Sequence, residues 1–455
     1  MHSMLILQRK VDLAFFVFVD ETAVLIWIYD CQRESSMDAQ QIRRLKPKLE
    51  SFLRRFAHCF ARSDTRASAA VYVNGQLSDL ERKSVEPMAL KGGVKPRTLQ
   101  EFLSQGRWHE DRLRDELQQI VVQEHASPRS IGIIDETSFP KKGEKTPGVQ
   151  RQHCGAVGKQ DNCIVTVHLG YVADQFHCLL DGELFLPEGW SEDRGRCREA
   201  GIPDDMVYRP KTDIALELYD HACSNGVHLE WLTFDEWYGV KPQFLRALDG
   251  RGQKFVGEVH KHYSAWIELP RVSHRRYRRR RGPRLAAGSR PARHVEDLRR
   301  HPALRDQDWQ MWRVKDGDKG PMLWEVKHTL IRVKDENGMP AEQPYHLLLA
   351  RNVLNRDEVK YFVSNAPENT NVQTLLLVAF SRWHIERCFE DHKGEVGLDH
   401  YEGRRYPGLK RHLILTAMSF LFLAKVRDEL RGEKPGFDGV PSAQSGVGSR
   451  AFVLA

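Results

Sequence analysis

The chain contains 455 residues, of which 41% are apolar and 29% charged, a balance typical of globular proteins long enough for two or three packed domains. Its formal net charge is +7, and because the basic residues are unevenly placed, local basic fields that bind phosphate backbones are expected. The eight cysteines show no C-x-x-C pair or regular spacing, which argues against a zinc knuckle and suits free thiols in a reducing compartment.

Residues 1–36 are interpreted as an extension of uncertain structure. Acidic residues interrupt the apolar stretch Val11–Cys31, and Asp20 and Glu21 stand side by side in its middle. Each would cost roughly 2.5 to 3.5 kcal/mol within a bilayer, which argues against a membrane span, and no signal-peptide cleavage site follows. The segment is either a strand pair or an upstream extension of the reading frame before a domain that starts at Met37.

Residues 37–125 are predicted to form a helical domain. Apolar residues recur every three or four positions from Leu45 to Phe60 in a background rich in Lys and Arg, and again from Leu99 to Val122. Such a wide apolar stripe needs partners, so a bundle is expected. Its basic surface favours DNA binding, for instance through a helix-turn-helix pair, although a purely structural bundle fits the pattern nearly as well.

An α/β pattern begins at Arg129. Apolar runs predict strands at 130–134, 162–172, 176–185, 227–234 and 254–259. Helical spacing at 211–224 predicts a helix before the fourth strand, and helical spacing at 242–248 predicts another before the fifth. The first three strands suggest a meander. The order of elements is that of a ribonuclease H-like α/β domain, a mixed sheet flanked by helices, which we predict for residues 126–430.

A β-rich insertion is predicted at 262–370, before the last catalytic helix. Strand-like stretches with turn signals between them lie at 308–314, 322–333 and 345–353. Helical spacing returns at 374–393 and 409–430, where the apolar run 413–424 is too short to cross a bilayer. Residues 431–455 are rich in Gly, Ser and Pro and are expected to form a flexible tail.

Asp135 and Asp235 each end an apolar run, and a glutamate directly follows each of them. Either residue alone is most simply a turn or helix-capping residue, but the shared format favours two strand ends lying side by side. Two Mg²⁺ ions about 3.5 to 4 Å apart activate the nucleophile and relieve charge on the leaving oxygen when a phosphodiester is displaced. Because Mg²⁺ takes oxygen ligands from only one or two carboxylates, three acids suffice for the pair.

The third candidate acid is Glu386. On a helix, Arg382 and Lys393 fall on the same side as Glu386 and Glu390, and the residues that anchor the helix to the sheet are expected to be Ile385, Cys388 and Phe389. On a lone helix these cations would be ion-pair partners on a solvated face. Beside metal ions they would hold DNA phosphates.

Three blocks of this sequence resemble bacterial insertion-sequence transposases of the DDE superfamily, over roughly residues 40–425. The first-Asp block is Asp135–Gly143 with Gly148–Gly155 and Gly158–Cys163, the second-Asp block is Phe234–Gly239, and the third is Trp383–Phe389 with Lys393 and Gly397–Tyr401. The resemblance is specific because the blocks occur in the right order with a β-rich insertion before the last.

The resemblance implies a ribonuclease H-like core that recognises terminal inverted repeats and moves an element by cut-and-paste transposition. Carried over by position, Asp135, Asp235 and Glu386 become the catalytic ligands of two Mg²⁺ ions, with Mn²⁺ as a substitute. Arg382 and Lys393 become the phosphate contacts of the Y-x2-R-x3-E-x6-K signature. No covalent protein nucleophile is needed.

The tyrosine of that signature is replaced by Ala379, followed by Phe380, so no hydroxyl is available at this position. The implied partner is double-stranded DNA, as element ends and target. A homodimer in the DNA complex is expected because both ends must be held together, and the implied location is the bacterial cytoplasm, in association with the nucleoid.

Two basic segments are further candidate DNA contacts. The first is the loop after Asp135, with Lys141, Lys142, Lys145 and Arg151, for which a solvated loop is the alternative. The second is the arginine run, with Arg275, Arg276, Arg278 and Arg279 around Tyr277. Like charges in a block repel one another and are typical of an interaction segment; the alternative is a disordered surface loop.

The aromatic residues beside the candidate ligands are Trp237, Tyr238 and Trp383. Packing against the sheet is favoured for them over stacking on an extruded base. Two alternatives to a transposase remain: a metal-dependent nuclease of the same fold that does not join DNA, and an inactive DNA-binding derivative. The presence of all three acids disfavours the latter.

Overall fold

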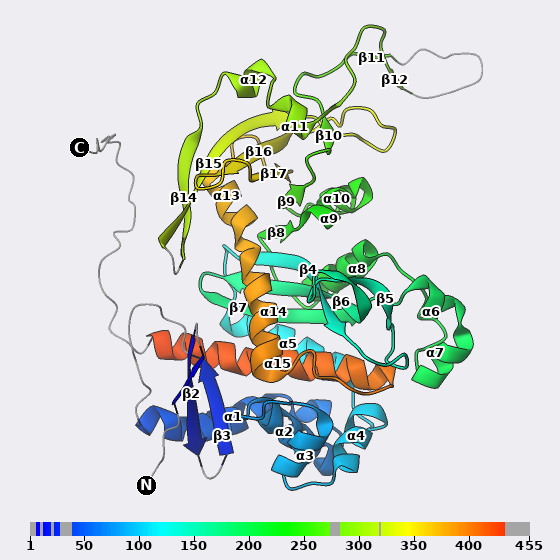
Figure 1. The fold of residues 1–455 in the computed structure, drawn as a ribbon, viewed down its shortest axis with the longest axis vertical. Helices are drawn as coiled ribbons and strands as arrows, with labels where there is room; N and C mark the ends of the chain where they lie inside the picture. The colour runs from blue at the N-terminus through cyan, green and yellow to red at the C-terminus, as the bar shows by residue number, and fades with distance from the viewer. Residues whose placement is uncertain are drawn as a thin grey trace.

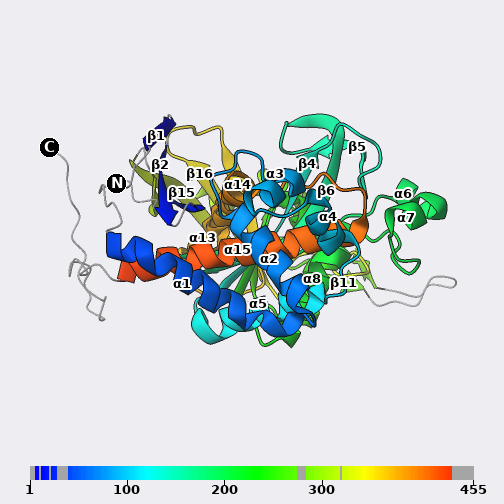
Figure 2. The same cartoon turned by 90° about the horizontal axis from the view of Figure 1, so that it is seen from below.

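The structure, a computed structural model, describes residues 6–9, 12–19, 22–27, 39–273, 283–317 and 320–432. The molecule is elongated: the N-terminal helices lie at one end, a large sheet occupies the middle, and a β-rich part forms the other end (Figure 1). The last helix, α15 (Tyr406–Gly432), crosses between the N-terminal helices and the sheet, as the view from below also shows (Figure 2).

The first described segments form a three-stranded antiparallel sheet beside α1. Its strands, in the order β1-β2-β3, are Ile6–Arg9, Asp12–Val19 and Thr22–Trp27. Residues 1–36 thus contain strands, as one of the two interpretations expected, but three of them instead of a pair.

The region from residue 39 to residue 124 is helical, as predicted. Its helices are α1 (Ala39–Arg55), the 3-10 helix η1 (Ala57–Cys59), α2 (Ser63–Gln76), α3 (Val85–Lys91), α4 (Pro96–Ser104) and α5 (Glu110–Glu124). The apolar stripe read from the sequence is buried at Leu45, Leu49, Phe52 and Phe56, because residues three and four apart share one face of a helix.

These helices share a core with α15. The hydroxyl of Tyr72 lies 2.8 Å from Nδ1 of His412, and the Gln76 side chain donates to the Thr416 hydroxyl at 3.0 Å. All four side chains are buried, and buried polar groups are costly unless they are paired. The helical end is therefore packed against the C-terminal helix as one unit.

The central sheet has ten strands in the order β14-β15-β16-β17-β9-β8-β4-β6-β5, with β7 also paired to β6. Its first six strands are β4 (Ile131–Pro140), β5 (Gln150–Cys154), β6 (Lys159–Ala173), β7 (Phe176–Leu184), β8 (Trp231–Phe234) and β9 (Phe255–Val259). The pairs β4–β6 and β6–β7 are antiparallel, which confirms the meander, whereas β4–β8 and β8–β9 are parallel. This mixed sheet flanked by helices is the predicted fold class.

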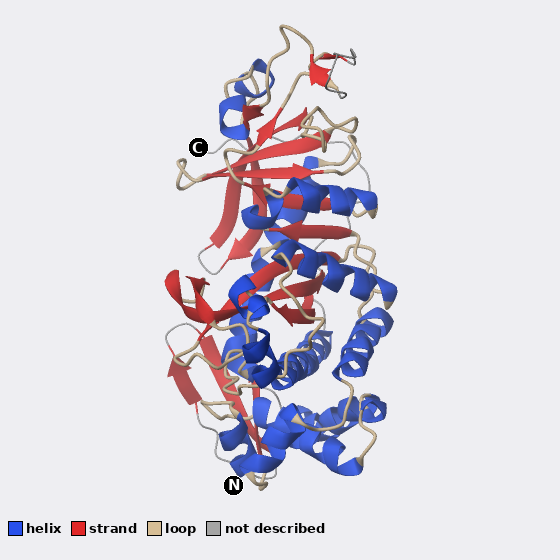
Figure 3. Cartoon of the chain, turned by 90° about the vertical axis from the view of Figure 1, so that its right-hand side faces the viewer, coloured by secondary structure: helices blue, strands red, loops and turns tan. Residues whose placement is uncertain are grey.

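The β-rich region continues this sheet. Its strands are the short pairs β10 (Ser264–Ala265) with β13 (Arg293–His294) and β11 (Val272–Ser273) with β12 (Arg284–Leu285), and then β14 (Gln310–Gly317), β15 (Gly320–Ile331), β16 (Tyr345–Asn352) and β17 (Val359–Ser364). Strand β17 pairs antiparallel with β9, so the sheet runs from the middle of the molecule into its far end (Figure 3). The pairing covers the edge that β9 would otherwise expose.

The remaining helices surround the sheet. They are α6 (Glu188–Glu192), α7 (Arg194–Ala200), α8 (Lys211–Ser224), α9 (Glu236–Gly239), α10 (Pro242–Gly250), α11 (Val295–Leu298), α12 (Pro302–Arg305), α13 (Val372–Ser381) and α14 (Trp383–Val396). The helix predicted at 374–393 is thus divided between α13 and α14 at Arg382. The backbone N–H of Ile385 donates to the carbonyl of Arg382 at 3.0 Å, a tighter turn than an α-helix makes.

Helix α14 lies close against the sheet. Its predicted anchor residues Ile385, Cys388 and Phe389 are all buried. A Cβ atom on Gly170 of β6 would lie 2.6 Å from Cδ1 of Ile385. The absence of a side chain at Gly170 therefore lets the helix that carries Glu386 approach the strands.

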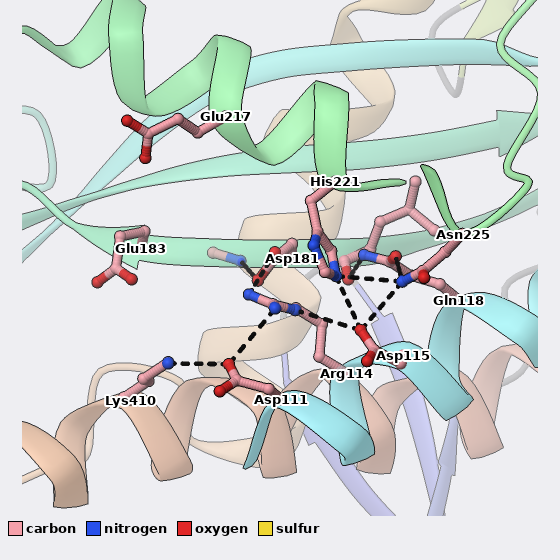
Figure 4. A network of polar contacts seen from close by, with 12 residues as sticks. Asp111, Arg114, Asp115, Gln118, Asp181, Glu183, Glu217, His221, Asn225 and Lys410 are labelled. Carbon is pink, nitrogen blue, oxygen red and sulfur yellow. Dashed lines mark hydrogen bonds and ion pairs between the residues drawn. The ribbon is translucent and has the colours of Figure 1, made fainter. Parts of the chain in front are cut away.

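A polar network fastens α5 to the sheet and to α15 (Figure 4). The guanidinium of Arg114 lies 3.4 Å from the Asp181 carboxylate of β7 and 3.4 Å from that of Asp111, and Lys410 of α15 lies 2.9 Å from Asp111. Further bonds join α5 to α8, through the pairs His221–Asp115 and Asn225–Gln118. The network bridges the helical end and the sheet.

Two predicted segments lie outside the described residues: the arginine run with Arg275, Arg276, Arg278 and Arg279, and residues 433–455 of the tail. The seven described cysteines are free thiols. Within the described ranges, no helix combines the length and apolar character needed to cross a membrane.

Candidate active site

Asp135 and Asp235 follow matched positions on neighbouring parallel strands. Ile134 of β4 is opposite Phe234 of β8. The residue that follows each of them is an aspartate, and neighbouring strands lie about 4.8 Å apart. Phe234 is in turn opposite Gly257 of β9, which puts Glu258 in the same row. We call Asp135, Asp235 and Glu258 the acid row. The sequence predicted its first two members and missed Glu258, which stands one residue before the end of its strand.

Asp135 is buried, with 8% of its surface exposed. Its Oδ1 accepts the backbone N–H of Glu136 at 2.8 Å, and its Oδ2 lies 3.2 Å from Nη1 of Arg382. Burial, and after it the negative charge of Asp235, raise the pKa of Asp135 to about 7, and Arg382 opposes both effects. The site therefore holds more negative charge than its one arginine compensates.

Asp235 caps the short helix α9. Its Oδ1 accepts the backbone N–H groups of Trp237 at 3.0 Å and Tyr238 at 3.3 Å, which fixes the carboxylate and leaves Oδ2 available. Burial raises the pKa of Asp235. The simple capping interpretation of this residue is correct, and it is compatible with a ligand role, because capping uses only one oxygen.

Helix α9 can reach this position only because residue 239 is glycine. A Cβ atom on Gly239 would lie 1.9 Å from the backbone oxygen of Glu258, closer than any non-bonded contact. The close approach of α9 to β9 therefore holds the Asp235 cap in place.

Glu386 reaches the aspartates through Arg382. Its carboxylate, 56% exposed, lies 2.8 Å from Nη2 of Arg382, the guanidinium that also contacts Asp135. Burial lowers the pKa of Arg382, but Asp135 and Glu386 outweigh burial and raise it. The structure thus brings Asp135 and Asp235 together directly and connects Glu386 to them through one shared cation.

The acidic side chains of the site offer oxygen ligands for a divalent cation. Among the described residues, no three His, Cys, Asp or Glu side chains are placed to hold a metal ion directly. Arg382 contacts both Asp135 and Glu386. The buried Asp135 and the half-buried Asp235, on adjacent strands, nevertheless offer the hard oxygen ligands that Mg²⁺ requires, and a bound cation would favour the charged form of Asp135, whose pKa is raised. The two aspartates therefore fit a divalent ion.

Two further glutamates near the aspartates are each paired with a lysine. Lys360 of β17 lies 3.1 Å from the Glu258 carboxylate, and Lys211 of α8 lies 2.7 Å from that of Glu136. The Tyr238 hydroxyl and Oε2 of Glu136 are buried without a hydrogen-bond partner. Sequence reasoning missed these roles, because they depend on contacts between distant elements.

The aromatic residues near the acids differ in exposure. Tyr238 is fully buried, as the packing interpretation predicted, whereas Trp237 is 38% and Trp383 37% exposed. Trp237 lies between two cations, with the ammonium groups of Lys211 and Lys241 5.1 and 4.9 Å from its ring. At the signature position, Ala379 is buried, and its neighbour Phe380 packs against Trp324.

The basic residues predicted to contact DNA lie in different settings. Lys142 and Arg151 are exposed. Lys141 donates to the carbonyls of Asp399 and Tyr401 at 3.2 and 2.6 Å, and burial lowers its pKa to about 8. The ammonium of Lys393 lies 5.7 Å from the Phe139 ring, and burial lowers its pKa as well. Lys141 therefore holds the segment after α14 in place, whereas Lys142 and Arg151 face solvent.

Comparison with known proteins identifies the class. Residues 55–321, more than half of the chain, match the sequence model of the DDE superfamily endonucleases. The chain therefore belongs to that superfamily, as its three sequence blocks predicted. The matched range contains Asp135 and Asp235, while Glu386 lies beyond it.

Within the class, the chain is similar to an insertion-sequence protein. The "Probable transposase for insertion sequence element IS701" of Microchaete diplosiphon is 31% identical over 199 residues, which cover 43% of this chain and 49% of the relative. The chain thus spans about half the length of this curated relative. The predicted resemblance to insertion-sequence transposases of the DDE superfamily is confirmed.

Proposed function

We propose that this chain is a transposase that binds the terminal inverted repeats of its element and catalyses metal-dependent strand cleavage and strand transfer. The observation that carries the proposal is the placement of Asp135 and Asp235 directly after the last paired residues of the parallel strands β4 and β8, with Glu386 joined to them through Arg382. Membership of the endonuclease superfamily supports phosphodiester cleavage. Similarity to an insertion-sequence transposase supports the joining step.

Asp135, Asp235 and Glu386 would hold two divalent ions, Mg²⁺ or Mn²⁺. Bound there, the ions would supply a nucleophile at neutral pH and charge relief on the leaving oxygen. The α9 amides orient Asp235, and burial keeps Asp135 away from competing water. Arg382 would exchange its carboxylate contacts for a DNA phosphate, which its planar fork of donors suits, and Lys393 would contribute a second phosphate contact.

Double-stranded DNA would be bound over a wider surface. We propose that the helices of residues 37–125 read the repeats, that residues 126–430 form the catalytic domain, and that Lys142, Arg151 and the arginine run at 275–281 contact the backbone. Two ends must be held in one complex, which favours a homodimer on DNA. Such a protein would act in the cytoplasm, at the nucleoid.

A strand-transfer assay with pre-cut element ends and Mg²⁺ tests the proposal. The wild-type protein is expected to give joined products, and Asp135→Asn, Asp235→Asn and Glu386→Gln are expected to give none while still binding DNA. Glu390→Gln is the matched control, because Glu390 is exposed one turn further along α14, and it should join normally. A protein that cleaves without joining would be a nuclease of the same fold, and joining by any of the three acid variants would remove that residue from the site.

A further inference from the structure

A basic cavity of about 600 Å³ lies apart from the acid row. It is formed by the loop after β4, by β5, by the start of β6, by α7 and by the segment between α14 and α15. Its charged lining residues are the bases Lys145, Arg151, Arg196, Arg404 and Arg405 and the acids Glu144 and Glu199. Basic side chains are in excess, so the cavity favours an anion.

Two of the arginines are held without being neutralised. The guanidinium of Arg196 donates to the carbonyl of Glu144 at 2.7 Å, and that of Arg405 donates to the carbonyl of Glu199 at 3.3 Å. A carbonyl fixes the direction of a guanidinium but carries no net charge, so the positive charge remains available. These contacts hold two positively charged guanidinium groups at the cavity lining.

The other two arginines of the cavity, Arg151 and Arg404, are exposed to solvent. Neither has an ion-pair partner among the described residues. Lys145 alone of the basic lining residues contacts a carboxylate there, that of Glu199 at 3.4 Å. The cavity therefore offers two exposed cations in addition to the two arginines that carbonyls hold in place.

The cavity is suited to phosphate and not to a base. Its one aromatic residue, Trp190, is covered by Arg196, whose guanidinium carbon lies 3.7 Å from the ring centroid. A base therefore has no free aromatic face on which to stack. Phosphate contacts position a nucleic acid without reading its sequence.

Strand register fixes the distance from the acid row. Asp135 is opposite His168 on β6, while Arg151 is opposite Asn162 of the same strand. Six residues of β6 thus separate the two positions, which is about 20 Å along an antiparallel strand. At 3.4 Å per base pair, a duplex that follows β6 from the acids reaches the cavity after about six base pairs.

We propose that this basic cavity binds the phosphate backbone of duplex DNA about six base pairs from the phosphate at the acid row, through Arg151 and Arg404. The inference rests on the proposed function for its DNA substrate. It adds Arg404, Arg196 and Arg405 to the DNA-binding surface, and it assigns them a position on the duplex.

The test measures how the affinity of the full chain for a labelled duplex carrying the element end changes with salt. Each phosphate contact contributes about 0.9 to the slope of log affinity against log salt. The double variant Arg151→Ala, Arg404→Ala should therefore lower the slope by about 1.8. The double variant Arg151→Lys, Arg404→Lys should keep the wild-type slope, because it keeps both charges. The double variant Arg300→Ala, Arg356→Ala, at two exposed arginines of the β-rich end, is the matched control and should also keep the slope.

An unchanged slope in the double alanine variant would overturn the proposal, as would equal loss in the control. Ethylation of phosphates about six base pairs from the cleavage site should weaken wild-type binding but not binding by the double alanine variant. Inorganic pyrophosphate should displace DNA from the wild type, beyond its effect on ionic strength, more than from the double alanine variant; equal displacement from both proteins would contradict the proposal. Loss of slope in a protein that joins no DNA ends would leave the cavity assigned and remove the transposase function.

Discussion

Nη1 of Arg382 lies 3.2 Å from Oδ2 of Asp135, although 247 residues separate them in the chain. The same guanidinium holds Glu386 at 2.8 Å. One cation therefore compensates part of the charge that two acids from different elements bring to the site. Binding of divalent ions and DNA would change the partners of Arg382, so several properties of the protein should depend on it.

Replacing Arg382 by alanine should make the stability of the protein depend more strongly on metal. Without metal, the variant leaves Asp135 without its counter-ion, at a cost of about 3 kcal/mol for a broken buried pair. A divalent ion bound to Asp135 should restore much of that loss. Thermal denaturation in chelator and in Mg²⁺ measures the effect, and a metal-induced rise in Tm no larger than that of the wild type would contradict the bridging role.

Replacing Gly239 by alanine should destabilise the protein and abolish cleavage together. The new Cβ atom meets the Glu258 carbonyl at 1.9 Å, and overpacking of this kind costs about 1 to 3 kcal/mol. Helix α9 must move, and the Asp235 carboxylate moves with it.

Gly250→Ala is the control for that experiment, because a Cβ atom there meets no atom within 4 Å. Urea unfolding and cleavage of the element end are measured for both variants. Normal cleavage by Gly239→Ala would show that α9 does not position Asp235.

Asp181 should make stability fall as pH rises from about 4 to about 6. Burial raises the pKa of its carboxyl to about 6, while Arg114 opposes the shift. Since the unfolded carboxyl titrates near 3.9, the folded state binds more protons in this window, and stability is lost as pH increases.

The Asp181→Asn variant isolates this effect. The unfolding free energies of wild type and variant are measured in urea across this pH range. The value for the wild type should fall relative to that of the variant as pH rises. A difference that stays constant from about pH 4 to about pH 7 would show that Asp181 titrates normally in the folded state.

The sequence predicted those parts of the site that local patterns carry. Asp135 and Asp235 follow short apolar runs, and the anchor residues of α14 follow helical spacing, so the candidate aspartates and the helix face were visible before the fold was known. The prediction that the first strand ends at Asp135 is wrong, because β4 continues to Pro140 through its pairing with β6. Glu258 lies inside its strand, and its place in the acid row depends on the pairing of β8 with β9.

Features that depend on long-range pairing were missed or only partly described. The residues of β5, Gln150–Cys154, lack apolar alternation, and they form a strand because the start of β6 offers a partner. The insertion was correctly predicted as β-rich, yet nothing in its local pattern indicates that β17 joins β9. Likewise, the contacts of Lys141 with the segment after α14 arise only from tertiary structure.

The most direct test of the account is the anomalous scattering of Mn²⁺ in crystals of the protein bound to a pre-cut element end. Two peaks about 3.5 to 4 Å apart are expected, coordinated by Asp135, Asp235 and Glu386, with Arg382 released to a DNA phosphate. Manganese peaks that avoid these three acids, with Arg382 still joined to Asp135 and Glu386 beside bound DNA, would contradict it.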